Sequence, residues 1–575
     1  MRFSPVFASC SSQLRRVVVS LAIASLLALV CSFNSSAQSP NDQPSDTVSG
    51  TVINSVTHEP IGRALVYTMD ERAAVLTDDH GHFELTLPGA PTSSNSTPQM
   101  HAPAMLQVKK PGYLSEQGSP GGDLVQPGQK EITLSLNPEG LIIGQVKFPS
   151  ADAADYAQVD LYRREVRDGV GQWEPLVQTR SRADGEFRFA GLRAGDYKVF
   201  TQEAVERDPL ATVPNGPVYG FPPRYFPAAR DFATADTIQL HAGQTVVANI
   251  APERQRYFDI RIPVIRPEGP PSGMEVSVHA QGHGGPGFQL GYDPDEGAIR
   301  GSLPNGSYSI EVASYEPEPA TGITNITVAN GPVNRPPVTL SPNINIEYNI
   351  HQDLTGAENS KMGQATTYIS LRSADEFAQF RGGGGMYQSN GNPPVLTGVK
   401  PGRYWVQVQP YNGDTYLESV TSGGKDLLRA PLVVPVGASV PPIDITLARN
   451  PGHLEVTVEV PGQPTTPTPG VSGGIVMASG MVGPYAPEPQ RSFIYCVPQP
   501  SDGGQVREVT GSSSNNTYFI SQVPPGSYRI LAFDKPQQLE YRNPAVMRAY
   551  DSKGQVVHVK AGEGTKVTVS TITSK

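Results

Sequence analysis

The sequence has 575 residues, enough for three to six domains that each bury a core of their own. Gly and Pro together make up about a fifth of the residues and charged residues only 17%, so long helices are not expected. The formal net charge of -10 at pH 7 disfavours nucleic acid and anionic membrane surfaces as partners.

The N-terminus has the pattern of a secretory signal. Arg15 and Arg16 precede an apolar run from Val17 to Val30, and small residues then lead to Ala37. The sequence therefore predicts a signal peptide over residues 1–37, cut between Ala37 and Gln38. The mature protein is expected to be secreted, to the periplasm or to the cell surface.

Cysteine content and hydropathy limit which disulfides, lipid anchors and membrane segments the mature chain can have. Cys10 and Cys31 fall within the signal, so Cys496 is the one remaining thiol and no internal disulfide is expected. Val30 stands where a lipobox needs a small residue, which argues against lipidation at Cys31. No later stretch reaches the roughly 18 apolar residues of a membrane helix, so no membrane insertion is expected after cleavage.

Beyond a polar linker at 38–47, the chain passes through five cycles of short alternating runs. Each cycle opens with one strand, turns at a Gly-aromatic pair and closes on another strand. The first cycle, for example, opens at Gly50 and closes at Leu136. The sequence predicts an all-β protein, a tandem array of five transthyretin-like or Ig-like β-sandwiches at residues 48–138, 139–252, 253–342, 343–447 and 448–575.

A Gly-x-Tyr phrase recurs in four of the cycles. Its copies lie 96 to 124 residues apart, which is the length of a domain, and begin at Gly195, Gly306, Gly402 and Gly526. The Gly is expected to end a tight turn, and the Tyr to bury its ring while its hydroxyl stays in water. A Gly at 81 and 185, and Asn at 516, are expected at positive φ in a second turn.

The letters of the first cycle resemble a known family. Val48-Ser49-Gly50-Thr51-Val52, Thr77-Asp78-Asp79-His80-Gly81-His82-Phe83 and Lys110-Pro111-Gly112-Tyr113 look like a carboxypeptidase regulatory-like domain. The resemblance is strongest for cycles one, two and five, and a Pro/Ser/Thr-rich insertion from Ala90 to Pro103 departs from it. It implies a transthyretin-like sandwich, grouped with carbohydrate-binding-like folds, and an accessory role without catalytic residues.

An aromatic loop is the leading candidate for a binding site. Four rings and a cation occur within nine residues, as Tyr219, Phe221, Arg224, Tyr225 and Phe226. Flat rings stack on sugars while a few polar groups set orientation, so the loop is a candidate polysaccharide surface. The alternative is that these rings cover one end of the sandwich as packing.

A polar turn at Asp78, Asp79, His80 and His82 could hold a metal, but a solvated hairpin turn explains it better. No His has Glu three residues on, so the zinc site of the peptidase itself is missing. No metal and no cofactor are therefore predicted.

Two further patterns have simpler explanations. Ser472 lies in a Gly-x-Ser-x-Gly match that lacks the strand and helix a nucleophile elbow requires. Lys147 and Asn249 stand on first and last strands, where related surface domains form covalent cross-links, but Lys rarely lies buried. The sequence therefore predicts no catalytic residues and no enzyme.

The function expected from the sequence is that of a non-enzymatic β-sandwich protein of the cell envelope that binds carbohydrate. The alternative is a structural or protein-interaction protein, an adhesion or spacer protein without a glycan ligand. Such a protein could pair an exposed sheet edge with another envelope protein by strand addition.

Overall fold

The computed structural model describes residues 47–87, 104–115, 123–125, 132–149, 157–206, 216–266, 272–281, 285–316, 318–352, 367–375, 377, 387–389, 394–410, 415–459, 492–501, 504, 506–511 and 516–573. The chain divides into two compact units, Met1–Pro111 with Ser119–Leu136, and Gly112–Gly118 with Asn137–Lys575. The predicted signal peptide lies outside the described residues.

Alternation of apolar and polar residues makes nearly all of the regular structure strand. In β1 (Thr47–Asn54) every second residue is buried, as a strand with one face on a core requires. The described helical residues are the short α2 (Pro544–Met547) and the 3-10 turn η2 (Arg548–Tyr550). Within the described part of the chain, no helix has the length and hydropathy to cross a membrane. The predicted all-β class with tandem sandwiches is confirmed.

Sandwich one contains β1 and the strands β2 (Leu65–Thr68), β3 (Ala74–Leu76), β4 (His82–Thr86), β5 (Ala104–Lys109), β6 (Tyr113–Ser115), β7 (Asp123–Val125) and β8 (Ile132–Pro138). Sandwich two contains β9 (Gly140–Gln145), β10 (Gln158–Arg167), β11 (Val170–Arg180), β12 (Glu186–Leu192), β13 (Gly195–Thr201), β16 (Arg224–Tyr225), β17 (Ile238–Leu240) and β18 (Thr245–Val247).

Sandwich three contains β14 (Ala204–Val205), β15 (Val218–Phe221), β19 (Gln255–Ile265), β20 (Ser272–Ala280), β21 (Gly291–Asp293), β22 (Ala298–Pro304), β23 (Gly306–Glu316), β24 (Ala320–Val328), β25 (Val333–Asn334), β26 (Val338–Thr339) and β27 (Ser341–Pro342). Two of these strands, β14 and β15, come from the range expected to form sandwich two. They instead extend the sheet of β19, because β15 pairs with it antiparallel.

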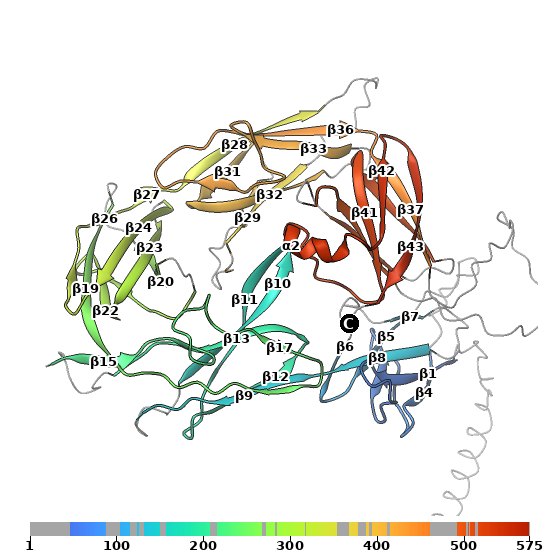
Figure 1. Ribbon diagram of the computed structural model, residues 1–575, viewed down its shortest axis with the longest axis horizontal. Coiled ribbons are helices and arrows are strands. Elements are labelled where there is room, and N and C mark those ends of the chain that lie inside the picture. The colour runs from blue at the N-terminus through green and yellow to red at the C-terminus, as the bar shows by residue number, and fades with distance from the viewer. Residues whose placement is uncertain are drawn as a thin grey trace, which may run out of the picture. The chain divides into compact units, whose positions relative to one another are not determined.

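Sandwich four contains β28 (Ile344–Gln352), β29 (Thr367–Ser373), β30 (Tyr387–Ser389), β31 (Val395–Val399), β32 (Gly402–Pro410), β33 (Thr415–Ser422), β34 (Lys425–Asp426), β35 (Leu432–Val434) and β36 (Ile443–Arg449). Sandwich five contains β37 (Gly452–Glu459), β38 (Ser492–Pro498), β39 (Arg507–Gly511), β40 (Thr517–Val523), β41 (Gly526–Phe533), β42 (Gln555–Val559) and β43 (Gly564–Ile572), with α2 and η2 between β41 and β42. Figure 1 shows these elements in the colours of the chain.

One topology recurs in all five sandwiches. The opening strand pairs in parallel with the closing strand, as β1 with β8, β9 with β18, β19 with β25 and β26, β28 with β36, and β37 with β43. On its other side it pairs antiparallel with the strand after the Gly-aromatic turn, as β1 with β4 and β9 with β12. The sequence cycle is therefore a structural repeat.

The recurring Gly-x-Tyr phrase forms a tyrosine corner. In each copy the phenol hydroxyl donates to the carbonyl oxygen four residues earlier, at 2.7 to 3.0 Å, from Tyr197, Tyr308, Tyr404 and Tyr528. The expectation that these hydroxyls stay in water was wrong, because a buried hydroxyl needs a partner and the preceding turn offers one. The expected positive φ is confirmed at Gly81 (74°), Gly185 (82°) and Asn516 (50°).

Candidate functional site

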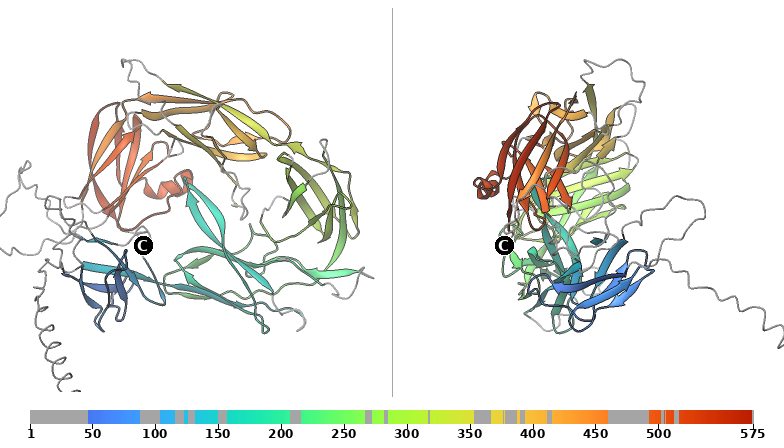
Figure 2. Two further views of the ribbon diagram at one scale, coloured as in Figure 1. Left: turned by 180° about the vertical axis from the view of Figure 1, so that it is seen from behind. Right: turned by 90° about the vertical axis from the view of Figure 1, so that its right-hand side faces the viewer.

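A long hairpin of sandwich two reaches away from its own sheet. Residues Val159 to Arg163 of β10 pair with β13, but beyond them β10 pairs with β11 alone. Asp168 (φ 51°) and Gly169 (φ 77°) close the hairpin in a two-residue turn with both φ values positive, the geometry that Asp-Gly favours. Two views show β10 and β11 ending beside α2 of sandwich five (Figures 1 and 2).

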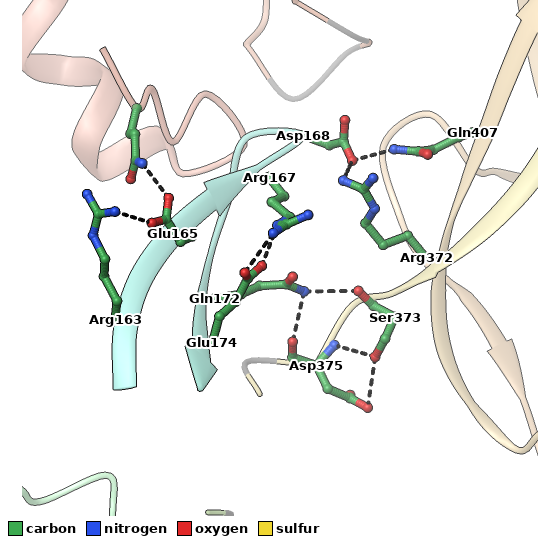
Figure 3. Close-up of polar contacts among 11 residues, drawn as sticks. Arg163, Glu165, Arg167, Asp168, Gln172, Glu174, Arg372, Ser373, Asp375 and Gln407 are labelled. Carbon is green, nitrogen blue, oxygen red and sulfur yellow. Dashed lines mark hydrogen bonds and ion pairs between the residues drawn. The ribbon is translucent and has the colours of Figure 1, made fainter. Parts of the chain in front are cut away.

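Asp168 at the tip of the hairpin binds sandwich four. Its carboxylate accepts hydrogen bonds from the Arg372 guanidinium of β29 and from the Gln407 amide of β32, as Figure 3 shows. The pair with Arg372 is also an ion pair with both side chains about a third exposed or less. The tip of one sandwich is thus held by a charged side chain of another, whose strand begins about 200 residues further along the chain.

Arg542 of sandwich five completes this contact. Its Nε donates to the main-chain oxygen of Asp168 at 3.0 Å, and its own amide donates to the Gly169 oxygen at 3.2 Å. A terminal nitrogen donates to the Leu428 oxygen of sandwich four at 2.7 Å. The guanidinium carbon lies 4.1 Å from the ring centroid of Trp405. Three sandwiches therefore meet at this point, which we call the junction (Asp168, Arg372, Trp405, Gln407 and Arg542).

The flank of the hairpin makes a second contact with sandwich four. The Gln172 amide donates to the carbonyl oxygens of Ser373 and Asp375 at 3.0 and 2.9 Å (Figure 3). Nearby, Phe377 enters an aromatic cluster of sandwich two, where its ring meets Phe232 edge to face at 4.7 Å. Polar and apolar contacts thus fasten the same two sandwiches.

The other flank lies against sandwich five. Arg164 forms an ion pair with Glu540 at 2.5 Å, and the Gln538 amide donates to Glu165 at 2.5 Å. The ring of Tyr541 covers Gly169, where an added Cβ would lie 2.6 Å from ring carbons. Burial raises the pKa of the Tyr541 phenol. Only glycine therefore suits this position, both for its φ and for the space.

The junction is equipped to hold surfaces together. Its groups are a carboxylate, two guanidinium groups, an amide and an indole, which suit charge-assisted hydrogen bonding and stacking. Among the residues that the structure describes, no group of three or more His, Cys, Asp or Glu could hold a metal ion. The sequence does not predict the junction, although the Asp168-Gly169 pair between two long alternating runs signals a projecting hairpin.

The predicted aromatic loop is largely internal. Phe221 and Tyr225 are 3% and 2% exposed, and the Tyr225 hydroxyl donates to the Pro286 oxygen of sandwich three at 2.5 Å. Phe226 packs against the core of sandwich two. These three rings face protein, so they offer no stacking surface to a sugar. The alternative interpretation as packing describes them.

The two remaining residues of the loop are occupied at its rim. Arg224 forms an ion pair with Glu253 at 3.0 Å. The Tyr219 ring is covered by Arg254, whose guanidinium carbon lies 4.0 Å from the ring centroid. A ligand would have to displace Arg254 to stack on Tyr219.

The other residues that the sequence suggested for metal binding, cross-linking or catalysis have local structural roles or lie outside the described residues. The Asp78 carboxylate accepts from the amides of His80 and His82 at 2.9 and 2.8 Å, which commits it to the turn. Lys147 is exposed, and Asn249 accepts from the Gln145 amide at 3.0 Å. Ser472 lies outside the described residues.

No protein-family model matches the chain, and no curated protein matches it. The Bacillus anthracis TIE protein is 10% identical, with 72% of this chain and 68% of that one covered and a TM-score of 0.15. The Streptococcus agalactiae minor pilin GBS52 is 12% identical (36% and 95% covered, TM-score 0.18), and a streptococcal ancillary pilin is 12% identical (54% and 99%, 0.19). At these TM-scores the similarities support no conclusion about function.

Proposed function

We propose that this protein is a non-enzymatic structural protein of the cell envelope that works through protein partners, as an adhesion or spacer protein. Its second to fifth sandwiches act as one scaffold and not as a flexible string. The resemblance to carboxypeptidase regulatory-like domains supports an accessory role of this kind, and the predicted signal peptide supports export.

The observation that carries the proposal is the junction. Arg542 and Asp168 are 374 residues apart in the chain, and Arg542 also binds Leu428 of a third sandwich. Domains joined only end to end move relative to one another by default. Contacts between sandwiches that are not neighbours in sequence remove that freedom, which a spacer or an adhesion protein needs to hold its partners at fixed positions.

Carbohydrate binding has less support as the main activity. Sugar sites use exposed flat rings, and three of the four rings of the predicted loop pack against protein. The binding surface of the scaffold is therefore better sought among groups that the sandwiches present together.

Small-angle scattering tests the scaffold directly. We expect the mature chain to gain in maximum dimension when Asp168→Ala and Arg542→Ala are combined. Glu296→Ala, which removes the exposed ion pairs with Arg261 and Arg300, serves as the control and should leave the scattering unchanged. A wild-type profile that already matches the double variant contradicts the proposal, and binding on a glycan array at unchanged stability favours the carbohydrate alternative.

A further inference from the structure

A cleft lies between the β10–β11 hairpin of sandwich two and sandwich five. It encloses about 900 Å³ and is lined by the hairpin, by the turn before β13 and by residues 536–541 after β41, with Tyr495 and Glu508 from the β38–β39 region. Ligand sites often have volumes of about 300–1,000 Å³ and often lie between domains. The cleft is therefore large enough for a side chain together with adjoining main chain.

The arginines that line the cleft are already neutralised. Arg163 pairs with Glu165 at 2.8 Å and Arg164 with Glu540 at 2.5 Å. The remaining two, at 167 and 372, pair with carboxylates at 174 and 168 respectively. Since each guanidinium has a carboxylate of its own, an anionic ligand would have to break an ion pair to bind.

Two carboxylates that line the cleft have no arginine paired with them among the described residues. Asp196 and Glu508 line it and take part in none of the ion pairs among the described residues. Asp196 is half-buried, and Glu508 accepts a hydrogen bond from Tyr495. The Glu508 side chain is exposed, so a ligand in the cleft can reach its carboxylate. The surplus charge of the cleft is negative.

Asp196 occupies the middle position of the Gly-x-Tyr phrase, where the residue differs between copies. The other copies have Ser307, Arg403 and Ser527 at this place, while the corner itself needs only the Gly and the Tyr. The fold therefore does not require a carboxylate here, which leaves Asp196 open to a role that belongs to sandwich two alone.

We propose that this cleft binds a lysine or arginine side chain of an extended segment of a partner protein, with Asp196 and Glu508 receiving the cation. The inference rests on the proposed function, that the chain acts through protein partners. The acidic chain, with its net charge of -10, attracts a basic partner to the site. A segment held there touches sandwiches two and five together, so its binding also stabilises the closed scaffold.

The test uses the mature chain and libraries of acetylated, amidated heptapeptides with a fixed central residue. We expect the lysine and arginine libraries to bind at least tenfold more tightly than the glutamine library. Asp196→Asn combined with Glu508→Gln should weaken that binding at least tenfold. The matched control, Asp236→Asn with Glu186→Gln, removes two exposed carboxylates of sandwich two and should leave it unchanged.

Three outcomes overturn the inference: no preference for a basic residue, equal loss in the control variant, or binding of cellohexaose in place of the peptides with the same dependence on Asp196. Tryptophan emission of each variant verifies that it is folded. Because scattering measures the scaffold without any ligand, failure of the peptide test and failure of the proposed function are distinguishable.

Discussion

Arg542→Ala tests whether the junction closes the scaffold. The change removes two charge-assisted hydrogen bonds, of which each contributes about 1.5 to 3 kcal/mol, and a cation–π contact of about 0.5 to 1 kcal/mol. Arg542 is half-buried, and its partners regain water on opening, so the lower values apply. We expect the closed form to lose about 3.5 kcal/mol, which is roughly three-hundredfold in the opening equilibrium.

Tryptophan emission provides the assay. The sequence has two tryptophans, and both lie where sandwiches meet, Trp173 in the aromatic cluster and Trp405 under Arg542. In a Trp173→Phe background, Arg542→Ala should shift Trp405 emission to longer wavelength. Hydrogen exchange of the amide at position 542, bonded to the Gly169 oxygen, should accelerate in parallel.

Arg254→Ala is the matched control, because it too removes a guanidinium from an aromatic ring, that of Tyr219, and with it an ion pair to Glu206. Its effects should be confined to the β15 region. If Arg542→Ala leaves both the Trp405 emission and the amide exchange at the values of the Arg254 variant, the junction does not hold the sandwiches together.

Other changes test the fold and its pH dependence. Tyr528→Phe, which removes a corner hydrogen bond, should cost about 1 kcal/mol in urea unfolding and Tyr528→Ala about 3 to 5; a Tyr528→Phe variant as stable as the wild type would deny the hydroxyl a role. Burial raises the pKa of the Asp160 carboxyl above its unfolded value of about 3.8. Its contribution to stability is therefore full below the unfolded pKa and is lost as pH rises through the folded pKa. Asp160→Asn should flatten this loss in urea midpoints measured from pH 4 to 7. Phe377→Ala, in a Trp405→Phe background, should shift Trp173 emission to longer wavelength, and an unchanged spectrum would contradict the contact with sandwich two.

Local features of the structure could be predicted because their causes are local. Alternation in β1 places every second residue on the core, and Gly81 and Asn516 take the positive φ that their turns need. The partner of the Tyr528 hydroxyl could not be predicted in the same way. Its acceptor is only four residues away, but the sequence does not show that the turn brings this carbonyl within reach of the hydroxyl.

The burial of the predicted aromatic loop could not be read from the sequence, for a physical reason. A run of aromatic residues such as Phe221 and Tyr225 has the same composition whether it faces a ligand or a neighbouring sandwich. The residues of the junction, by contrast, lie far apart in the sequence and form no local pattern. Asp168 could have been noticed as half of an Asp-Gly turn, but nothing near Arg542 indicates that it binds this turn.

The sequence by itself determined the all-β class, the five cycles and the turns, because a period of two and a glycine at positive φ act within a few residues. Only the tertiary structure decided that the β10–β11 hairpin extends to sandwiches four and five, and that Asp168 and Arg542 meet. The reason is that contacts across 374 residues depend on how whole sandwiches dock, and neither spacing nor composition encodes that docking.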